Sequence, residues 1–375
     1  MATRTGKGDW PDDLLTEILL RLPVKAIIRF KCVAKTWYSL FESPSFASQH
    51  LSISKKNKRF LICHTDTSGN LVMRLFVDQT LVSYQDLFPQ MPQHIGDEYP
   101  IICIYDGLLC LCNTKPNYIT LWNPFTREFR LLPQCNENMP PQIETFGHVI
   151  GFGWDSFSND YKVIYQRTYI DLEEDIGKTH HAVYRMSTDS WRVLEGKDVE
   201  AFEELAICNS DSNTCVNGVY YWVAFKILHY HKVLAFHFGN EVFQLIDWPT
   251  VPEPQYSNGQ LCRLPDDRIS LWISHFDENG KSNDVWVLND EGQYWTKLLS
   301  IGPLLGVERM FGFFNKKING SIKVFVEAIS EQLLLYDLDT QEFKDLNIRL
   351  RQVWDCLEVY TYEESLVALS RDRIL

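Results

Sequence analysis

One phrase recurs five times in the middle and later parts of this sequence, and it constrains the fold more than any other feature. Each copy has a short apolar run, a polar turn, an aromatic residue and then Leu or Ile. The aromatic residues are Phe129, Trp191, Phe243, Trp295 and Phe343, at separations of 62, 52, 52 and 48 residues. A second phrase, a turn followed by an alternating strand, precedes each copy, as at Gly107 and Gly218. This spacing predicts similar units arranged in series.

The repeated units predict an all-β domain. Short alternating runs lie between Gly, Asn, Asp and Pro turns, and a period near fifty indicates a kelch-like β-propeller whose blades are four-stranded sheets. The polar turns should link the two outer strands, and the aromatic residues should pack between neighbouring blades. Segment 59–88 and the C-terminal segment 353–369 can supply a sixth blade closed by both chain ends, which leaves no open sheet edge. A β-sandwich is the alternative.

The N-terminal residues predict a different structure, three short helices within about forty residues. A helix begins near Pro11, because proline and the acidic Asp12 and Asp13 suit a first helical turn. An apolar stripe follows at helical period, and Pro23 ends this helix and opens a second through residue 30. A third helix is expected from about Ala34, ending before position 44. So many large apolar side chains in a small module predict an apolar surface that meets a partner or the next domain.

These N-terminal residues resemble an F-box, the module that docks substrate receptors onto the Skp-type adaptor of a cullin ubiquitin ligase. The likeness rests on Pro-Asp-Asp-Leu-Leu at 11–15, Leu22-Pro23, Arg-Phe-Lys-Cys-Val at 29–33, and Lys35 with Trp37. Trp10 and Ala34 depart from the family pattern with apolar or small residues. The resemblance implies these adaptor-facing positions: Pro11, Leu14, Leu15, Ile18, Leu19, Leu22, Pro23, Val33 and Trp37. Burying about half a dozen of them would contribute on the order of 10 kcal/mol before association costs. The alternative is an ordinary helical cap on the following domain.

The second domain resembles the plant F-box-associated domain. The matching lines are Trp122–Pro133, Gly151–Asp155, Asn159–Val163 and Asn217–Trp222. Together with the N-terminal module they look most like the S-locus F-box group, whose members recognise secreted pistil ribonucleases in pollen self-incompatibility and direct them to ubiquitination. The resemblance implies an F-box at 9–50, a linker at 51–59 and a propeller-like substrate-recognition domain at 60–375, so the fold class is α+β multidomain with about six blades.

Composition and charge limit the choice of partner. Residues 1–50 hold 7 basic and 5 acidic residues, so the rest of the chain holds 29 and 44, a net charge of −15. This acidity argues against nucleic acid and anionic membranes and favours a basic protein client. No apolar run is long enough to span a membrane and no signal peptide is visible, so we expect a globular protein of the cytoplasm, with the nucleus as an alternative and the pollen tube cytosol under the S-locus hypothesis.

No recognisable catalytic or metal-binding motif occurs, so the sequence predicts neither catalytic residues nor cofactors. The histidine pairs His180-His181 and His229-x-His231 lack further converging ligands, and the ten cysteines indicate reduced, buried side chains. Cys110 and Cys112 share one strand face and should pack inward. A catalytic propeller would need convergent ligands that the sequence does not offer.

Two acidic segments are the candidates for client binding. The first, 169–178, carries Asp171, Glu173, Glu174 and Asp175 and lengthens the second unit; the other, 195–204, follows the same unit. We predict that they form an acidic rim for a basic client, against the alternative of ordinary solvated loops. The sequence therefore predicts a non-catalytic substrate receptor of an SCF-type (Skp, cullin, F-box) ubiquitin ligase. The alternatives are a receptor for an unrelated plant client and a ligase-independent binding protein.

Overall fold

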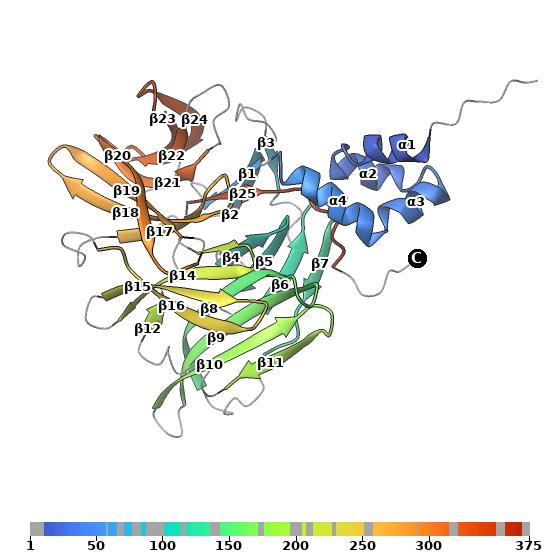
Figure 1. Ribbon diagram of the computed structural model, residues 1–375, viewed down its shortest axis with the longest axis horizontal. Coiled ribbons are helices and arrows are strands. Elements are labelled where there is room, and N and C mark those ends of the chain that lie inside the picture. The colour runs from blue at the N-terminus through green and yellow to red at the C-terminus, as the bar shows by residue number, and fades with distance from the viewer. Residues whose placement is uncertain are drawn as a thin grey trace, which may run out of the picture.

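The computed structural model shows a small group of helices attached to one side of a ring of β-sheets (Figure 1). The structure describes residues 11–57, 59–65, 71–76, 84–87, 101–113, 118–135, 143–171, 176–195, 205–207, 213–226, 230–250, 258–289, 291–314, 322–349 and 357–369. The helices in this part of the chain are α1 (Asp12–Leu19), α2 (Val24–Phe30), α3 (Lys35–Phe41) and α4 (Pro44–Ser54). Among the described residues, every helix is too short or too polar to be a membrane span.

The described strands form six antiparallel sheets, which we number as blades. Blade 1 has the order β25 (Glu358–Tyr362), β1 (Arg59–Thr65), β2 (Leu71–Phe76), β3 (Tyr84–Asp86). Blade 2 contains β4 (Ile101–Tyr105), β5 (Leu108–Asn113), β6 (Tyr118–Asn123) and β7 (Glu128–Leu131). Blade 3 contains β8 (Ile143–Asp155), β9 (Asp160–Asp171), β10 (Ile176–Arg185) and β11 (Ser190–Leu194).

The remaining three blades follow in chain order. Blade 4 contains β12 (Leu205–Ile207), β13 (Thr214–Val216), β14 (Val219–Lys226), β15 (Tyr230–His237) and β16 (Val242–Asp247), with β12 and β13 both paired to β14. Blade 5 contains β17 (Asn258–Arg263), β18 (Ile269–Asp277), β19 (Gly280–Leu288) and β20 (Trp295–Leu304). Blade 6 contains β21 (Val307–Phe313), β22 (Lys323–Ala328), β23 (Gln332–Asp337) and β24 (Phe343–Arg349).

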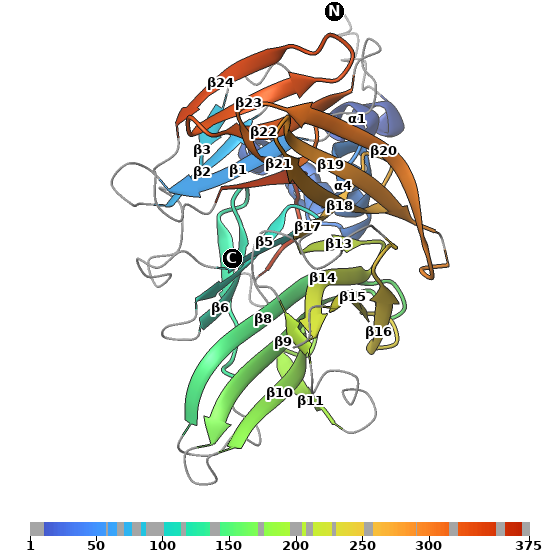
Figure 2. The same cartoon turned by 90° about the vertical axis from the view of Figure 1, so that its left-hand side faces the viewer.

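The two ends of the propeller close the ring within blade 1. Strand β25 pairs antiparallel with β1, and Arg59 lies opposite Tyr362 while Leu61 lies opposite Tyr360. The innermost strands then contact one another around a circle, from β25 through β4, β8, the β13–β14 pair, β17 and β21 back to β25 (Figure 2). This confirms the predicted six-bladed propeller with a blade shared by both ends of the chain, and it excludes a β-sandwich.

The hydrophobic core lies between the blades rather than inside one layer. Each of five buried clusters combines side chains from adjacent blades, for example Leu61 with Leu111, Val233 with Leu271, and Phe60 with Phe325. A blade therefore buries its two faces only when both neighbours are present. Ring closure is for this reason a condition for the stability of every blade.

Close approach of blades 3 and 4 requires glycine on β8. A Cβ atom on Gly153 would lie 2.4 Å from the ring of Phe238, and one on Gly151 would lie 2.8 Å from the ring of Trp222. Both contacts are shorter than van der Waals distance. The Gly-Phe-Gly line of the sequence is thus explained by packing between these two blades.

A buried charge network joins the same two blades. The Lys162 ammonium, 2% exposed, lies 2.7 Å from Asp155 Oδ2 and 2.7 Å from Glu241 Oε1, and donates to the Phe238 carbonyl oxygen at 3.0 Å. Burial acts to raise the pKa of Glu241, but hydrogen bonds from Lys162 and two arginines outweigh it and lower that pKa to about 2. Lys162 of the Asp-Tyr-Lys sequence is therefore a buried cation that joins blades 3 and 4.

The predicted role of the repeated aromatic residues is correct for three of the five. The Trp191 indole N–H donates to the Pro133 carbonyl oxygen at 2.6 Å, and the Trp295 indole N–H donates to the Asp247 carbonyl oxygen at 2.8 Å, each in the preceding blade. Phe243 packs against His181 of blade 3, with ring centroids 5.9 Å apart. Phe343 packs instead against Tyr336 of its own blade, with ring centroids 4.8 Å apart, and is 45% exposed. For Phe129, which is 52% exposed, packing between blades stays a prediction.

We predict that Lys162→Met destabilises the propeller by about 3–5 kcal/mol, because it leaves the buried Asp155 carboxylate without its cation and removes the buried cation that pairs with Glu241. Urea unfolding followed by tryptophan fluorescence would measure this loss. The matched control is Lys232→Met, which removes a solvent-accessible ion pair with Asp247 and should cost less than about 1 kcal/mol. Equal losses in the two variants would show that the Lys162 network contributes no more than a surface pair.

A second prediction concerns how the stability of the fold depends on pH. Burial, followed by the charge of Arg167, lowers the pKa of His148 from 6.5 to about 4, and its ring nitrogen Nδ1 lies 2.6 Å from the Tyr165 hydroxyl oxygen. Between pH 6.5 and 4 the unfolded chain binds the proton more readily, so stability falls as the pH falls. The melting temperature should therefore decrease from pH 7 to pH 5, and His148→Phe should reduce that decrease. An unchanged slope in His148→Phe would contradict this assignment.

Candidate functional site

The first candidate surface is the outward side of the helical module, and the structure divides the nine predicted adaptor-facing residues among three environments. Leu14, Ile18 and Val33 are 44%, 45% and 62% exposed, and Pro11 and Pro23 are exposed as well. The half-buried members are Leu15, Leu22 and Trp37. Leu19 is only 2% exposed and lies inside the module. The structure thus brings exposed apolar side chains of α1 and of the turn before α3 to the surface, while Leu19 supports α1 from within.

The prolines and acids act locally as the sequence predicts. Helix α1 begins directly after Pro11 with Asp12 and Asp13 in its first turn, and α2 begins directly after Pro23. The module packs around a buried cluster that also includes the half-buried Leu22 and Trp37 at its border. This arrangement fixes the exposed apolar residues on a folded support.

A fourth helix, α4, is a difference from the sequence prediction of three helices and a linker at 51–59. It runs without a break from Pro44 to Ser54. Ser43 caps its start, since the Ser43 hydroxyl oxygen accepts a hydrogen bond from the Phe46 N–H at 3.2 Å, and proline occupies the first turn. Phe46, His50 and Leu51 are buried. The His50 ring nitrogen Nε2 lies 2.9 Å from the Leu22 carbonyl oxygen, so α4 packs against the preceding helices, and the predicted polar linker is helical as far as Ser54.

The C-terminal segment attaches the module to the propeller. Helix α2 starts after a proline that offers no side-chain cap, and Glu364 takes that role: its Oε2 accepts the Val24 N–H at 2.8 Å. Arg59 of β1 pairs with the other oxygen of the same carboxylate. Leu366 is buried in the helical cluster. One short segment therefore supplies both a cap and an apolar contact to the module.

Blade 2 holds the same segment from the other side. The Asn123 side-chain amide donates to the carbonyl oxygens of Ser365 and Val367, each at 3.0 Å, and Glu128 Oε2 accepts the Leu369 N–H at 2.8 Å. The Lys55 ammonium at the end of α4 adds an ion pair of 2.6 Å with Asp106. The module is consequently fixed to blades 1 and 2 at several points.

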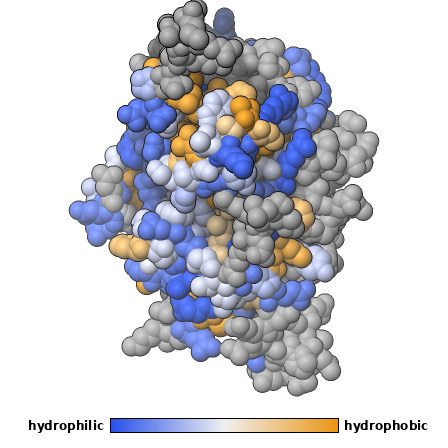
Figure 3. All heavy atoms as spheres, turned by 90° about the vertical axis from the view of Figure 1, so that its right-hand side faces the viewer, coloured by the Kyte–Doolittle hydropathy of each residue, from blue (hydrophilic) through white to orange (hydrophobic). Residues whose placement is uncertain are grey.

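The ring has two edges, and the helical module covers one of them. In each antiparallel blade the turn between its first two strands lies at one edge and the turn between its second and third strands lies at the other. Lys55 contacts Asp106, in the turn between β4 and β5, so the helices cover the first edge. The ring edge away from the helices is seen in Figure 2, and the side that carries the helices is seen in Figure 3, where exposed apolar residues lie among hydrophilic ones.

The predicted acidic rim lies mostly outside the described residues. Glu173, Glu174 and Asp175 are not among them, and of Asp171 only the backbone is described, at the end of β9 opposite Ile176. Of the second acidic segment, only Glu195 is described, and it is exposed. The rim stays a prediction.

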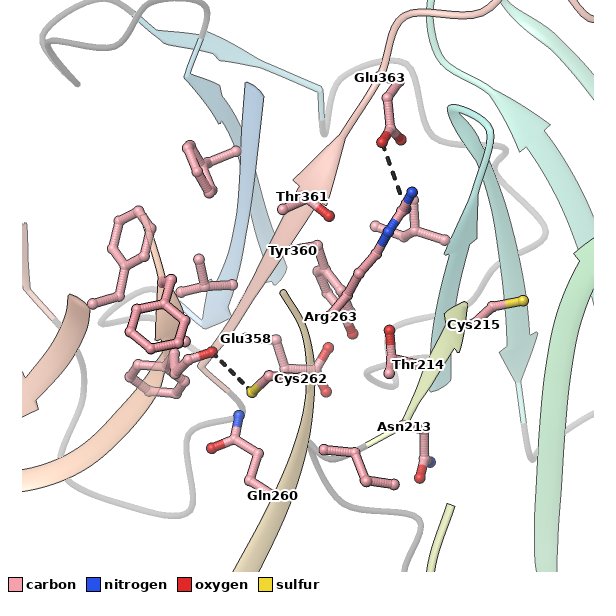
Figure 4. Close-up of a pocket in the computed structure, with 18 residues that line it drawn as sticks. Asn213, Thr214, Cys215, Gln260, Cys262, Arg263, Glu358, Tyr360, Thr361 and Glu363 are labelled. Carbon is pink, nitrogen blue, oxygen red and sulfur yellow. Dashed lines mark hydrogen bonds and ion pairs between the residues drawn. The ribbon is translucent and has the colours of Figure 1, made fainter. Parts of the chain in front are cut away.

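A pocket lies between the innermost strands, and polar side chains from several blades line it (Figure 4). Arg263 points toward Glu363, with Nη1 and Oε1 separated by 3.6 Å, and also donates to Asp267 at 3.0 Å. Burial acts to lower the pKa of Arg263, but the two carboxylates outweigh it and raise that pKa. The contact with Glu363 joins blade 5 to the segment after β25, and Asp267 holds the arginine from within blade 5.

The remaining candidates for chemistry have structural roles. Cys110 and Cys112 are buried as expected, and burial raises the pKa of Cys112 to about 12, which keeps it a thiol. His180 and His181 are strand residues that are buried rather than on the surface, and of the second pair only His231 is described. Among the described residues, no group of three or more His, Cys, Asp or Glu side chains could hold a metal ion.

Sequence reasoning missed the residues that join the two domains, above all Glu364, Asn123 and Asp106. They are single polar residues in no repeated pattern, so their importance comes from contacts between segments far apart in the sequence. The one available signal was an apolar run, 366–369, that follows two glutamates and a serine.

Comparison with known proteins gives a consistent result over nearly the whole chain. A model for the F-box domain matches residues 8–49, and a model described as the F-box associated beta propeller domain matches residues 70–369. F-box protein CPR1 of Arabidopsis thaliana is 24% identical over 94% of this chain and 86% of its own. An F-box/kelch-repeat protein of the same plant is 26% identical over 78% of this chain and 80% of its own. Another F-box relative from this plant is 28% identical over 66% of this chain, and the match spans 62% of that relative.

The attachment of the module is testable through its cap. Glu364→Gln should weaken the hydrogen bond to Val24 and remove the charge that Arg59 pairs with, so amide exchange in the first turn of α2 should accelerate about tenfold. The matched control is Glu342→Gln, an exposed position of blade 6, which should leave that exchange unchanged. Protection in α2 that survives Glu364→Gln would mean that apolar packing alone holds the module.

Proposed function

Because this chain belongs to the F-box proteins that carry an F-box associated β-propeller domain, we propose that it is the substrate-recognition subunit of an SCF-type ubiquitin ligase. The observation that carries the proposal is that a folded F-box exposes three apolar side chains, Leu14, Ile18 and Val33, at its surface. Helix α4 lies between this surface and the propeller (Figure 1), so a bound adaptor can occupy the surface without meeting the ring.

The proposed mechanism is positional. The F-box binds a Skp-type adaptor and through it the cullin and RING subunits, and the propeller binds a client protein. A separate conjugating enzyme then transfers ubiquitin to a client lysine that the assembly holds nearby. In this scheme the chain contributes geometry and needs no reacting group or cofactor of its own.

The rigid attachment of the F-box supports this mechanism. Glu364, Leu366 and Lys55 connect the helices to blades 1 and 2 at separate points. A client on the ring would therefore keep a fixed position relative to the adaptor. Fixed geometry raises the effective concentration of a lysine near the transfer site, whereas a loose joint would lower it.

The narrower proposal is that the client is a basic secreted pistil ribonuclease and that the receptor acts in the pollen tube cytosol. Its support is the likeness to the S-locus F-box group in lines such as Gly151–Asp155, and the acidic charge of the chain after residue 50. An F-box receptor for another plant client, in the cytoplasm or nucleus, and a ligase-independent binding protein are the alternatives. Ubiquitination of a purified non-self pistil ribonuclease by the reconstituted ligase would support the narrower proposal, and its absence would remove it.

The receptor role itself predicts how surface variants bind the adaptor. Ile18→Glu with Val33→Glu should weaken binding to a purified Skp-type adaptor by at least about a hundredfold, because two charges would be buried in an apolar interface. Both side chains are already exposed, so the variant should stay folded. Binding can be measured by calorimetry and by co-purification.

The matched control for this experiment is Phe157→Glu. It introduces the same charge at a side chain that is 85% exposed on the propeller, and adaptor binding should not change. If the folded wild-type chain does not bind the adaptor, the receptor role is wrong. If the Ile18 and Val33 variant binds as tightly as the wild type, the adaptor uses a different surface.

A further inference from the structure

Three of the most exposed large apolar side chains in the described part of the chain belong to blades 5 and 6. Phe276 is 75% exposed, Leu305 is 76% exposed and Ile329 is 62% exposed. They lie in different segments, at the end of β18, after β20 and after β22. Single exposed apolar residues are common on proteins, but a group of them in one place marks an interaction surface.

Backbone contacts bring these three segments together. Phe276 lies opposite Lys281 in the β18–β19 pair, and Lys281 lies opposite Leu304 in the β19–β20 pair. Leu305 follows at once in the connection to blade 6. There the Ile329 N–H donates to the Gly306 carbonyl oxygen at 2.9 Å. The three side chains therefore border one junction between two blades, which we call the 5–6 junction.

Carboxylates surround the 5–6 junction. Glu278 and Glu308 are exposed and Glu331 is half-buried, and the Glu308 carboxylate attracts the Lys281 ammonium. The two cations in these segments, Lys281 and Arg309, both have partners within the chain. The Lys281 ammonium donates to the Glu308 carbonyl oxygen, and the Arg309 guanidinium pairs with Glu327 at 2.6 Å. The junction thus presents apolar side chains inside an acidic border.

The 5–6 junction lies at the ring edge away from the helices. The β18–β19 and β22–β23 turns connect second and third strands, whereas Lys55 contacts the turn between the first two strands of blade 2. Figures 1 and 2 show the β18–β19 hairpin reaching out on the side opposite the helical module. A protein bound there would not compete with the adaptor.

We propose that the client of this receptor binds at the 5–6 junction, through a segment that combines exposed apolar side chains with lysine or arginine. This inference rests on the proposed function and names the surface and the chemistry of its partner. Apolar anchors would supply affinity and the acidic border would speed encounter with a basic partner. A second copy of this chain is disfavoured as the occupant, because a symmetric contact would bring two acidic borders together. An anionic membrane is disfavoured by the same charge.

The test uses the full chain bound to its adaptor and three fluorescent peptides of equal length, made from Leu and Lys, from Leu and Glu, or from Ser and Lys. We expect the Leu and Lys peptide to bind and the other two to bind at least about tenfold more weakly. In the variant Phe276→Ser, Leu305→Ser, Ile329→Ser the affinity for this peptide should fall at least about tenfold. Phe157→Ser, an equally exposed site on the other edge, is the control and should bind as the wild type does.

The acidic border needs its own variant. Glu278→Gln, Glu308→Gln and Glu331→Gln together should weaken binding of the Leu and Lys peptide and reduce the dependence of its affinity on salt. Equal binding of the Ser and Lys peptide would show nonspecific charge attraction and overturn the proposal. Unchanged affinity in the apolar variant would overturn it as well.

The natural partner can be trapped with a photo-crosslinking amino acid at position 276 and, as the control, at position 157. A crosslink specific to position 276 should join a protein that carries an apolar and basic segment, and its purified form should lose at least about tenfold in affinity for the apolar variant. A crosslink at 276 to a second copy of this chain would overturn the proposal.

Adaptor binding, measured in the same samples, should be unchanged in every variant. If the wild type does not bind the adaptor, only the receptor role is contradicted. The peptide affinities test binding at the 5–6 junction independently.

Discussion

The pairing of β25 with β1 is the interaction on which the rest of the molecule depends. It brings the C-terminal strand against the first strand after the helices and completes the ring of inner strands. The blades share their cores with their neighbours, so an open ring would expose the faces of two blades at once. The chain directly after β25 then caps α2 through Glu364 and places Leu366 among the helices. The same C-terminal segment therefore closes the ring and attaches the F-box to it.

The sequence motifs shared with the family mainly provide contacts between neighbouring blades. Gly153 permits the ring of Phe238 to approach β8, Lys162 joins two carboxylates across blades 3 and 4, and Trp191 bonds to the preceding blade. These residues are buried or face neighbouring sheets, so they are not available to a client. Choice of client must then depend on positions at the edges of the ring, where the packing leaves side chains free to vary. The 5–6 junction and the predicted acidic rim are both of this kind.

The repeat made the architecture predictable, because evenly spaced strands and turns are a local property of the sequence. The same holds for the starts of α1 and α2, which prolines and acidic residues mark. What could not be predicted depends on contacts between distant segments. Helix α4 carries a buried histidine on its inner side, and Glu364 caps a helix from a distant part of the chain. The 5–6 junction joins three separated segments and has no signature in any one of them.

In a receptor of this shape the ring would hold the adaptor-binding F-box and the client-binding 5–6 junction at a fixed separation. The F-box and the 5–6 junction lie at opposite edges of the ring, and the C-terminal segment ties the F-box to blade 2. Because the F-box is fixed to blades 1 and 2, the ring itself sets the distance and angle between adaptor and client. A flexible joint would let the client sample many orientations, and each productive one would be populated less. Buried ties such as Lys162 and Arg263 would then serve ubiquitin transfer indirectly, since they keep the blades in the register that holds these two surfaces in place.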